Sequence, residues 1–243
     1  MSDLKISNLK KILTVCGLIL VTVAAAAVAS AFMYPGGPSV AAPSLGRASS
    51  FAVLGGSTVT NTGATAITGD LGLSSPGVSL TGFPPGTQAR GIQHVGDPAA
   101  NQAQSDAQRA YLALADMPCG TALTGQDLGG KALAPGVYCF TSSAELTGQL
   151  VLDTRGKPKG IWVFQIASTL TTATNSSVVM RKSGRPGNVF WQVGSGATLG
   201  TGTAFIGNIL AYSSITMNTA ANLQGRALAR QAVTMDSNQM RVP

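Results

Sequence analysis

The spacing of threonine residues in this chain suggests a functional surface. Thr198 is followed at the same phase by Thr216 and Thr234, in steps of 18 residues (216 − 198). Gly207 and Gly225 repeat with the same step. A threonine side chain combines a methyl group with a hydroxyl, which can anchor an ordered water molecule. The spacing therefore predicts a regular row of such groups.

Catalytic and metal chemistry find little support. A glycoside hydrolase or polysaccharide lyase needs two nearby carboxylates or a metal cluster, and no two acidic residues lie at i and i+2 or i+4. His94 is the only histidine, and we expect it in a loop or at a helix cap. The sequence thus predicts no enzyme, no metal site and no cofactor. The acidic residues beyond the first segment are Asp70, Asp97, Asp106, Asp116, Asp127, Glu145, Asp153 and Asp236.

The composition favours a fold with a narrow core. Of 243 residues, 10% are charged and 5% are aromatic, whereas 30 are glycine. A broad globular core needs more large apolar side chains than a fold of thin stacked layers does. The net charge is +7, but the basic residues beyond the first segment are scattered, apart from loop-like clusters at 155–160 and 181–185. A nucleic-acid partner would need a basic stripe with stacking aromatics, so we expect none.

Residues 1–31 are predicted to be a secretory leader. Lysines precede an apolar run that starts at Ile12, and residues 29–31 match an A-x-A cleavage pattern. The same run is long enough to span a bilayer, so an uncleaved membrane anchor is the alternative. Either one places the remainder outside the cytoplasm, with the membrane as a partner only if the segment stays uncleaved. Residues 32–44 are predicted to be a linker, and 45–243 the folded domain.

Two cysteines, Cys119 and Cys139, remain beyond the leader, which contains Cys16. In an exported protein such a pair is expected to form a disulfide. Closing a loop of about twenty residues would contribute about 3 kcal/mol to stability. Two buried thiols are the alternative. A zinc site is not expected, because a single histidine accompanies the pair.

The segment DPAANQAQSDAQRAYLALADMP, at 97–118, predicts the one long helix. Asp97 can serve as its N-cap, Pro98 suits the first turn and Pro118 ends it. A narrow stripe of small apolar residues at helical spacing would let this helix lie close against a flat surface. The stripe consists of Ala103, Ala107, Ala110, Leu114 and Met117.

The remainder of the folded region predicts short strands separated by Gly, Asn and Ser. Segments 136–152, 160–180 and 188–210 share an aromatic, β-branched strand, a small-residue corner and a threonine-rich strand. With an 18-residue period, three strands of about six residues close one triangular coil, and coils stack about 4.8 Å apart. The predicted fold is all-β with one long helix: a right-handed, three-sided β-solenoid with the helix alongside.

Two alignments set the expected register of neighbouring coils. The first matches residues 164–166 with 191–193, and the second matches Thr169-Leu170 with Thr198-Leu199. The second implies a spacing of 29 residues (198 − 169), with the excess over 18 placed in the loop around 181–187 and at the corners.

Several phrases occur in order between Leu45 and Met240: FAVLGGSTVTNTGATAITGDLG, GFPPG, LTGQDLGG, PGVYCF, FQIASTLTTATNSSVV, NVFWQVGSGATLGTGTAFIGNILA and GRALARQAVTMDSN. In these phrases the chain resembles the ice-binding protein family, domain of unknown function 3494. The resemblance implies a discontinuous β-solenoid with one helix alongside. It also implies that the partner is an ice surface and its ordered water.

The ice-contacting tetrad of that family resembles T-A/G-x-T/N. Positions 62–65, 172–175 and 219–222 fit it, 201–204 departs at its last position, and 147–150 is a poorer copy. The ice-contacting residues implied in this chain are Thr62, Thr65, Thr147, Thr172, Thr174, Asn175, Thr201, Thr203, Thr219 and Asn222.

Strand alternation predicts how the tetrads are presented. Residues i and i+2 share a face of a strand, so Thr172 and Thr174 are expected to point outward together, as are Thr201 and Thr203. The fourth position would lie inward or at the corner. The 18-residue step then places Thr201 beside Thr219.

The predicted function is that of a monomeric antifreeze protein. It would adsorb to ice through a flat, threonine-rich solenoid face and inhibit ice growth and recrystallisation. The alternative is an extracellular adhesin or structural surface protein that uses the solenoid as a scaffold. Threonine and asparagine ladders also arise simply because β-branched residues suit strands and asparagine suits corners.

Overall fold

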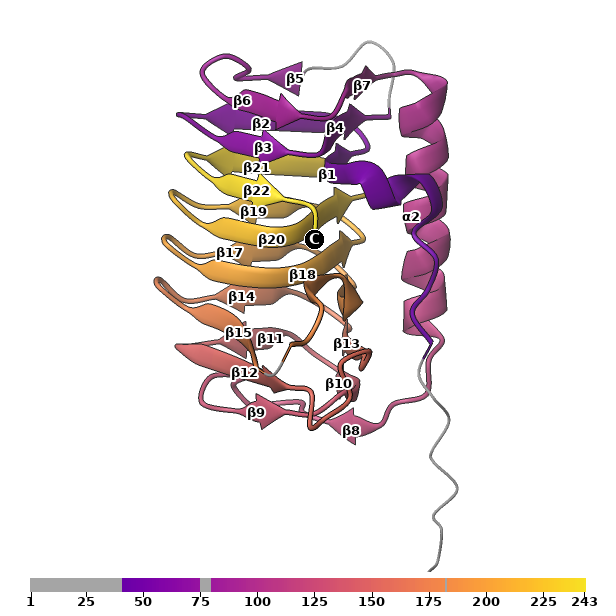
Figure 1. Cartoon of the computed structure of the whole chain (residues 1–243), viewed down its shortest axis with the longest axis vertical. Coiled ribbons are helices and arrows are strands. Elements are labelled where there is room, and N and C mark those ends of the chain that lie inside the picture. Colours follow the sequence, from indigo (N-terminus) through magenta and orange to yellow (C-terminus); the bar gives the residue numbers. More distant parts are fainter. Residues whose placement is uncertain (1–40, 75–79, 182) are drawn as a thin grey trace, which may run out of the picture. The chain divides into compact units, whose positions relative to one another are not determined.

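The computed structural model describes residues 41–74, 80–181 and 183–243 (Figure 1). Contacts divide the chain between Ser39 and Val40, and every element below belongs to the second unit. The predicted leader at 1–31 and most of the predicted linker at 32–44 lie outside the described residues, so these boundaries stay predictions. Within the described ranges, no helix combines the length and apolarity needed to cross a membrane.

The strand pairs of this unit are all parallel and build two sheets, one of 15 strands and one of seven. The seven-stranded sheet is one side of the solenoid. It contains β2 (Thr58–Thr62), β5 (Leu80–Thr81), β11 (Ala144–Leu146), β14 (Leu170–Thr172), β17 (Ala197–Leu199), β19 (Ile215–Met217) and β21 (Ala232–Asp236).

The 15-stranded sheet bends to form the other two sides. The side next to the helix contains β1 (Phe51–Gly55), β4 (Asp70–Leu73), β7 (Gln93–Val95), β8 (Thr121–Ala122), β10 (Gly136–Phe140), β13 (Trp162–Ile166) and β16 (Val189–Val193). The third side contains β3 (Ala66–Thr68), β6 (Thr87–Arg90), β9 (Ala132–Leu133), β12 (Gln149–Asp153), β15 (Ser177–Arg181) and β22 (Gln239–Arg241). Two longer strands, β18 (Ala204–Ala211) and β20 (Asn222–Ala229), run from the third side onto the helix side.

Glycine makes the corner within β18 and β20 possible. Gly207 has φ +116°, a conformation that residues with a Cβ rarely adopt. Gly225 is its register partner, and a Cβ on Gly225 would lie 1.8 Å from the Gly207 carbonyl oxygen. The two glycines that repeat with the 18-residue step therefore lie side by side at this corner.

The 18-residue period is confirmed where it was clearest, since Thr198 pairs with Thr216 and Thr216 with Thr234. The alignment of 164–166 with 191–193 is also confirmed. The alignment of Thr169 with Thr198 is wrong, because Thr171 is the partner of Thr198. The loop between these coils adds nine residues to the period (198 − 171 = 27), where the alignment had added eleven.

The solenoid is discontinuous along the sequence. The first coil stacks on the last one, with β1 beside β20, β2 beside β21 and β3 beside β22. Figure 1 shows this as indigo and purple strands lying next to yellow ones. The connection from β7 back to β8, at the opposite end of the stack, is made by the helix α2 (Pro98–Ala115).

The core between the three sides is narrow and contains a stack of aromatic rings. The centroids of Phe164 and Trp191 lie 3.9 Å apart, and Tyr138 and Phe205 extend the stack at 5.5 and 4.8 Å. The indole N–H of Trp191 donates to the Ile206 carbonyl, so the buried polar atom is satisfied. The stacked side chains fill the core between neighbouring coils and so help to keep the outer faces rigid.

Helix α2 has the start predicted for it and the predicted stripe from Ala103 to Leu114, but it ends at Ala115, so Pro118 does not mark its end and Met117 lies beyond it. Asp97 accepts a hydrogen bond from the Ala100 N–H and Pro98 opens the helix. The stripe packs on a second apolar cluster that includes Phe51, Phe190 and Leu210. The helix, the helical turn η1 (Gly46–Ser50) that contacts it, and the helical turn η2 (Pro186–Asn188) that contacts β18 and β20 belong to the same unit as the sheets.

The buried carboxylate of Asp106 ties the helix to η1. Burial would raise the pKa of Asp106, but hydrogen bonds from the Arg47 N–H and the Gln102 amide, together with the charge of Arg109, lower that pKa overall. At the C-terminal end of α2, the amide of Gln165 donates to the carbonyls of Leu114 and of Met117, which follows the helix. These contacts fix the helix on one side of the solenoid and leave the seven-stranded sheet uncovered by it.

Candidate threonine face

One threonine from almost every strand of the seven-stranded sheet points away from the core. The strand pairs align Thr171 with Thr198 and carry the line on through neighbouring coils. The strand residues on either side are buried, except Leu80 beside Thr81, which is half-buried. We call this line the threonine row. In spatial order it consists of Thr171, Thr198, Thr216, Thr234, Thr60 and Thr81.

The backbone sets the spacing of the row. Adjacent strands of a sheet lie about 4.8 Å apart, so the six threonines span about 24 Å. All six side chains are exposed or half-buried. Thr60 donates to the Thr234 hydroxyl at 3.3 Å, which links the first coil to the last. Since threonine is β-branched, its rotamers are restricted and the row is ordered before it meets a partner.

The rest of this sheet keeps the row accessible. The strands of the sheet contain no lysine or arginine, and their charged members are Glu145 and Asp236. Glu145 is the strand neighbour of Thr171 and marks one end of the row. Residues two positions before the row threonines are short, namely Thr58, Thr169, Gly196, Ser214 and Ala232. We call this outer surface of the seven-stranded sheet the threonine face.

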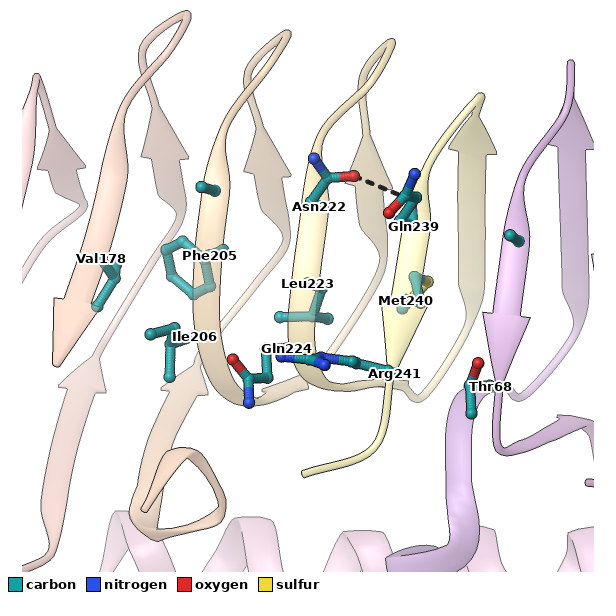
Figure 2. A pocket seen from close by; sticks show the side chains of 12 residues that line it. Thr68, Val178, Phe205, Ile206, Asn222, Leu223, Gln224, Gln239, Met240 and Arg241 are labelled. Carbon is teal, nitrogen blue, oxygen red and sulfur yellow. Dashed lines mark hydrogen bonds between the residues drawn. The ribbon is translucent and has the colours of Figure 1, made fainter. Parts of the chain in front are cut away.

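The other two sides of the solenoid differ from this one. The helix covers the first, where Phe51, Val163 and Phe190 are buried against it. The third side has a hollow of about 440 Å³, lined in part by Gln224 and Arg241 (Figure 2). The threonine face is therefore the side suited to contact with an extended flat partner.

Most of the predicted tetrad residues lie at the edge of this face. They are exposed at the corner where the seven-stranded sheet meets the third side. Thr201 and Thr219 occupy neighbouring turns there, as expected, because the N–H of Gly202 donates to the Thr219 carbonyl at 3.0 Å. The exposed members are Thr62, Thr147, Thr174, Asn175, Thr201, Thr219 and Asn222.

Thr65, Thr172 and Thr203 correct the prediction, because they are buried, with exposed fractions of 0, 3 and 0%. Thr172 Oγ1 accepts the Gly200 N–H at 2.9 Å and forms a 2.8 Å hydrogen bond with Thr203 Oγ1. These three side chains hold the corner together from inside and do not reach the surface.

The physical reason is that the tetrads lie where a strand ends and a turn begins, and Thr172, the last residue of β14, points inward because it alternates with the outward Thr171. Each contains a residue with positive φ: Gly63, Asn175, Gly202 and Ala220 have φ values of 78°, 57°, 67° and 60°. A residue in this conformation ends the alternation of faces that a strand would impose. The rule that pairs i with i+2 therefore fails in the tetrads, although it holds in the strands before them.

The threonine row itself was missing from the residues predicted to contact ice. Its signal was nevertheless present, because the 18-residue phase of Thr198, Thr216 and Thr234 is the row. Thr171 was hidden by the misplaced alignment, and Thr60 lies 174 residues from its partner Thr234. No period in the sequence points to that last contact.

The acidic residues whose hydrogen-bond partners the structure gives have structural roles. Asp127 and Glu145 are separated by the 18-residue step, but Asp127 accepts the N–H groups of Gly129 and Thr147 and so holds a turn. His94 contacts the helix cap, with its Nδ1 at 2.7 Å from Asp97 Oδ2. In the described ranges, no three residues among His, Cys, Asp and Glu are grouped so as to hold a metal ion.

Cys119 and Cys139 form a disulfide in the structure, with an S–S distance of 2.05 Å and a Cα–Cα distance of 5.8 Å. The bond joins the segment that follows α2 to strand β10. It fastens the end of the helix to the side that the helix covers. The predicted pairing is confirmed, and the alternative of two buried thiols is not supported.

The fold and the site define a class of protein. It is a parallel β-solenoid with one helix at its side and an uncovered sheet that carries a threonine row. The comparison with protein families agrees, since the model described as "Ice-binding-like" matches residues 53–241. The chain belongs to this ice-binding-like family, and the resemblance noted from the sequence phrases is confirmed.

Individual relatives are similar over most of their length. An ice-binding protein of Nostoc sp. (strain HG1) is 57% identical over 198 residues, which cover 81% of this chain and 72% of that protein. An ice-binding protein from the Antarctic ascomycete Antarctomyces psychrotrophicus has 40% sequence identity to this chain, and its crystal structure superimposes with a TM-score of 0.81. The match covers 84% of this chain and 99% of that protein chain. The DUF3494 domain of Shewanella frigidimarina ice-binding protein 1 is 30% identical with a TM-score of 0.74, over 83% of this chain and 97% of that domain.

Proposed function

We propose that this protein binds ice through the threonine face and thereby inhibits ice growth and recrystallisation. The observation that carries the proposal is the row of six threonines on the solenoid side that the helix leaves uncovered. The names of its relatives support the choice of ice as the partner. We expect no enzymatic activity and no cofactor.

Ice presents an ordered array of water molecules, so a binder needs a rigid array of its own. The solenoid provides one because its strand spacing repeats and its aromatic core is stacked. Each threonine methyl favours ordered water around it, and each hydroxyl can hold one of those waters. Single contacts of this kind are weak. Many made together by side chains that lose little entropy give useful affinity.

We propose that the exposed corner residues widen this surface. Thr147, Thr201, Thr219 and Thr62 lie beside the row at turns of the same corner, and each carries the same pair of groups. Asp236 accepts a hydrogen bond from the Thr219 hydroxyl, which restricts that side chain. Once the face is bound, the ice front has to grow with a curve between adsorbed molecules, and such growth is disfavoured.

We also propose that the protein acts outside the cytoplasm as a monomer. The apolar segment with its A-x-A pattern and the disulfide between Cys119 and Cys139 both fit an exported chain. Under this proposal residues 1–31 are a leader or anchor, 32–44 are a linker and 45–243 are the ice-binding domain.

Thermal hysteresis and ice-crystal shaping by purified residues 32–243 test the function. We expect faceted crystals, a gap between melting and growth temperatures, and slower recrystallisation. Round crystals and unchanged recrystallisation, with the protein shown to be folded, would contradict ice binding and favour the adhesin or scaffold alternative.

A further inference from the structure

The third side of the solenoid opens into a hollow where two strands separate. β15 pairs with β18 through Ser177 and Ala204, and the hollow is lined from there by Val178 on one side and Phe205 on the other. Its volume is about 440 Å³. Figure 2 shows β18, β20 and β22 side by side across it, with side chains from all three pointing to the same region.

Polar side chains form one part of the lining. Gln224, Arg241 and Thr68 are consecutive outward residues of β20, β22 and β3, and Asn222 and Gln239 stand next to them. Among the described residues, no hydrogen bond is made by the side chains of Gln224, Gln239, Arg241 or Thr68, although Gln88 and Gln165 elsewhere in the solenoid are paired. The hollow thus presents amide, guanidinium and hydroxyl groups that are free to take a ligand.

The other part of the lining is apolar. Its accessible floor consists of Ile206 and the exposed Ala204 and Ala66. Phe205, Leu223 and Met240 lie behind them in the core and are only 1–2% exposed. A ligand seated here would meet hydrogen-bonding groups along its edge and hydrocarbon beneath it.

The charge of this region is one-sided. The strands around the hollow from β18 to β6 contain Arg241, Arg226 and Arg90 and no acidic residue. Arg226 is held by Asn208 and the Ser49 carbonyl, so it is already engaged. Arg90 of β6 is the register partner of Thr68 in the neighbouring strand β3. It therefore extends the positive potential beyond Arg241.

We propose that this hollow binds a carboxylate-bearing polysaccharide chain, of the uronic-acid type, independently of ice. The guanidinium of Arg241 matches a carboxylate with two parallel hydrogen bonds. The amides of Gln224 and Gln239 can donate to and accept from sugar hydroxyls, while the apolar floor suits the C–H face of a sugar ring. Free side chains repeat here at the strand spacing, so the site accepts an extended chain better than a compact one.

The location separates this site from the threonine face. The hollow lies on the third side of the solenoid and the threonine row on the seven-stranded sheet, and the tetrad corner is between them. A polysaccharide in the hollow would leave the row exposed. One molecule can then attach to an acidic extracellular matrix and to ice at the same time.

Calorimetric titration of the purified protein with a mannuronate tetramer tests the proposal. We expect saturable binding, which Arg241→Gln weakens by about tenfold or more, the change expected when a hydrogen bond to a charged group is lost. Gln224→Ala should weaken it as well. Arg155→Gln removes the same charge from an exposed turn and should bind like the unaltered protein.

A neutral mannose tetramer is the ligand control and should bind at least about tenfold more weakly, because it lacks the carboxylates. Ice shaping by Arg241→Gln should be unchanged, which separates this proposal from the proposed function. The proposal is overturned by absence of binding, by equal losses in Arg241→Gln and Arg155→Gln, or by equal affinity for the neutral tetramer. Loss of ice shaping in a folded Arg241→Gln protein would also overturn it, because the hollow would then be part of the ice site.

Discussion

Thr171 and Thr172 are neighbours in β14, but one side chain points to solvent and the other into the protein. A matched pair of substitutions therefore tests which of them belongs to the threonine face. Thr171 belongs to the threonine row and is exposed. Thr172 is 3% exposed and hydrogen-bonded inside the corner. Thr171→Lys should abolish ice shaping and leave the fold intact, whereas Thr172→Val should weaken the fold and leave ice shaping intact.

The magnitude for Thr172→Val follows from the bonds it removes. Valine has the shape of threonine but no hydroxyl, so the buried N–H of Gly200 loses its acceptor. Thr203 keeps its second hydrogen bond, to the Ala173 carbonyl at 3.2 Å. One unsatisfied buried donor costs about 1–3 kcal/mol. For a domain of this size that corresponds to a fall in Tm of about 2–12 °C.

The magnitude for Thr171→Lys is small for stability and large for activity. An exposed strand position tolerates such a change within about 0.5–1 kcal/mol. The long lysine side chain, however, holds the neighbouring Thr198 away from the ice surface. Differential scanning calorimetry and thermal hysteresis on both variants give the two readouts. If Thr172→Val lost ice shaping at an unchanged Tm, or Thr171→Lys kept it, the assignment of the faces would be refuted.

Three further changes test the fold that supports the face. Replacing Cys119 and Cys139 by serine should lower the free energy of unfolding by about 3 kcal/mol, measured by denaturant titration, and the unaltered denatured protein should show no free thiol at these positions. Because the pKa of Asp106 is lowered in the folded state, its carboxylate stabilises the protein above pH 3.8, and that contribution is lost as pH falls through the folded pKa. Tm should accordingly fall less on acidification in Asp106→Asn than in the unaltered protein; an identical pH profile would contradict this role. Gly225→Ala should lower Tm or prevent folding, because the new Cβ meets the Gly207 carbonyl oxygen at 1.8 Å, and an unchanged Tm would show that the corner can relax.

The parts of this fold that depend on local rules could be predicted from the sequence. Asp97 and Pro98 mark the start of the helix because capping is local, and the alanine stripe marks the side that packs. The 18-residue phase gives the stacking of Thr198 on Thr216 because consecutive coils are neighbours. The site was harder to predict because it combines several coils that are not consecutive in the chain.

Two physical features limited the prediction of the site. Positive φ values, as at Asn175, turn the chain within the tetrads, so strand alternation does not extend from Thr172, the inward last residue of β14, to the exposed Thr174. The row is completed by Thr60, which reaches Thr234 only because the first coil closes on the last. That closure is a tertiary contact, and it leaves no periodic signal in the sequence.

Ice is proposed to contact the threonine row, and Thr216 lies within that row between Thr198 and Thr234. The most direct test is thermal hysteresis of Thr216→Tyr compared with Lys157→Tyr, a control with the same new side chain on an exposed turn. We expect Thr216→Tyr to lose thermal hysteresis and crystal shaping at an unchanged Tm, while Lys157→Tyr keeps both. Full activity in a folded Thr216→Tyr protein would contradict this expectation and place the ice-binding surface on another side of the solenoid.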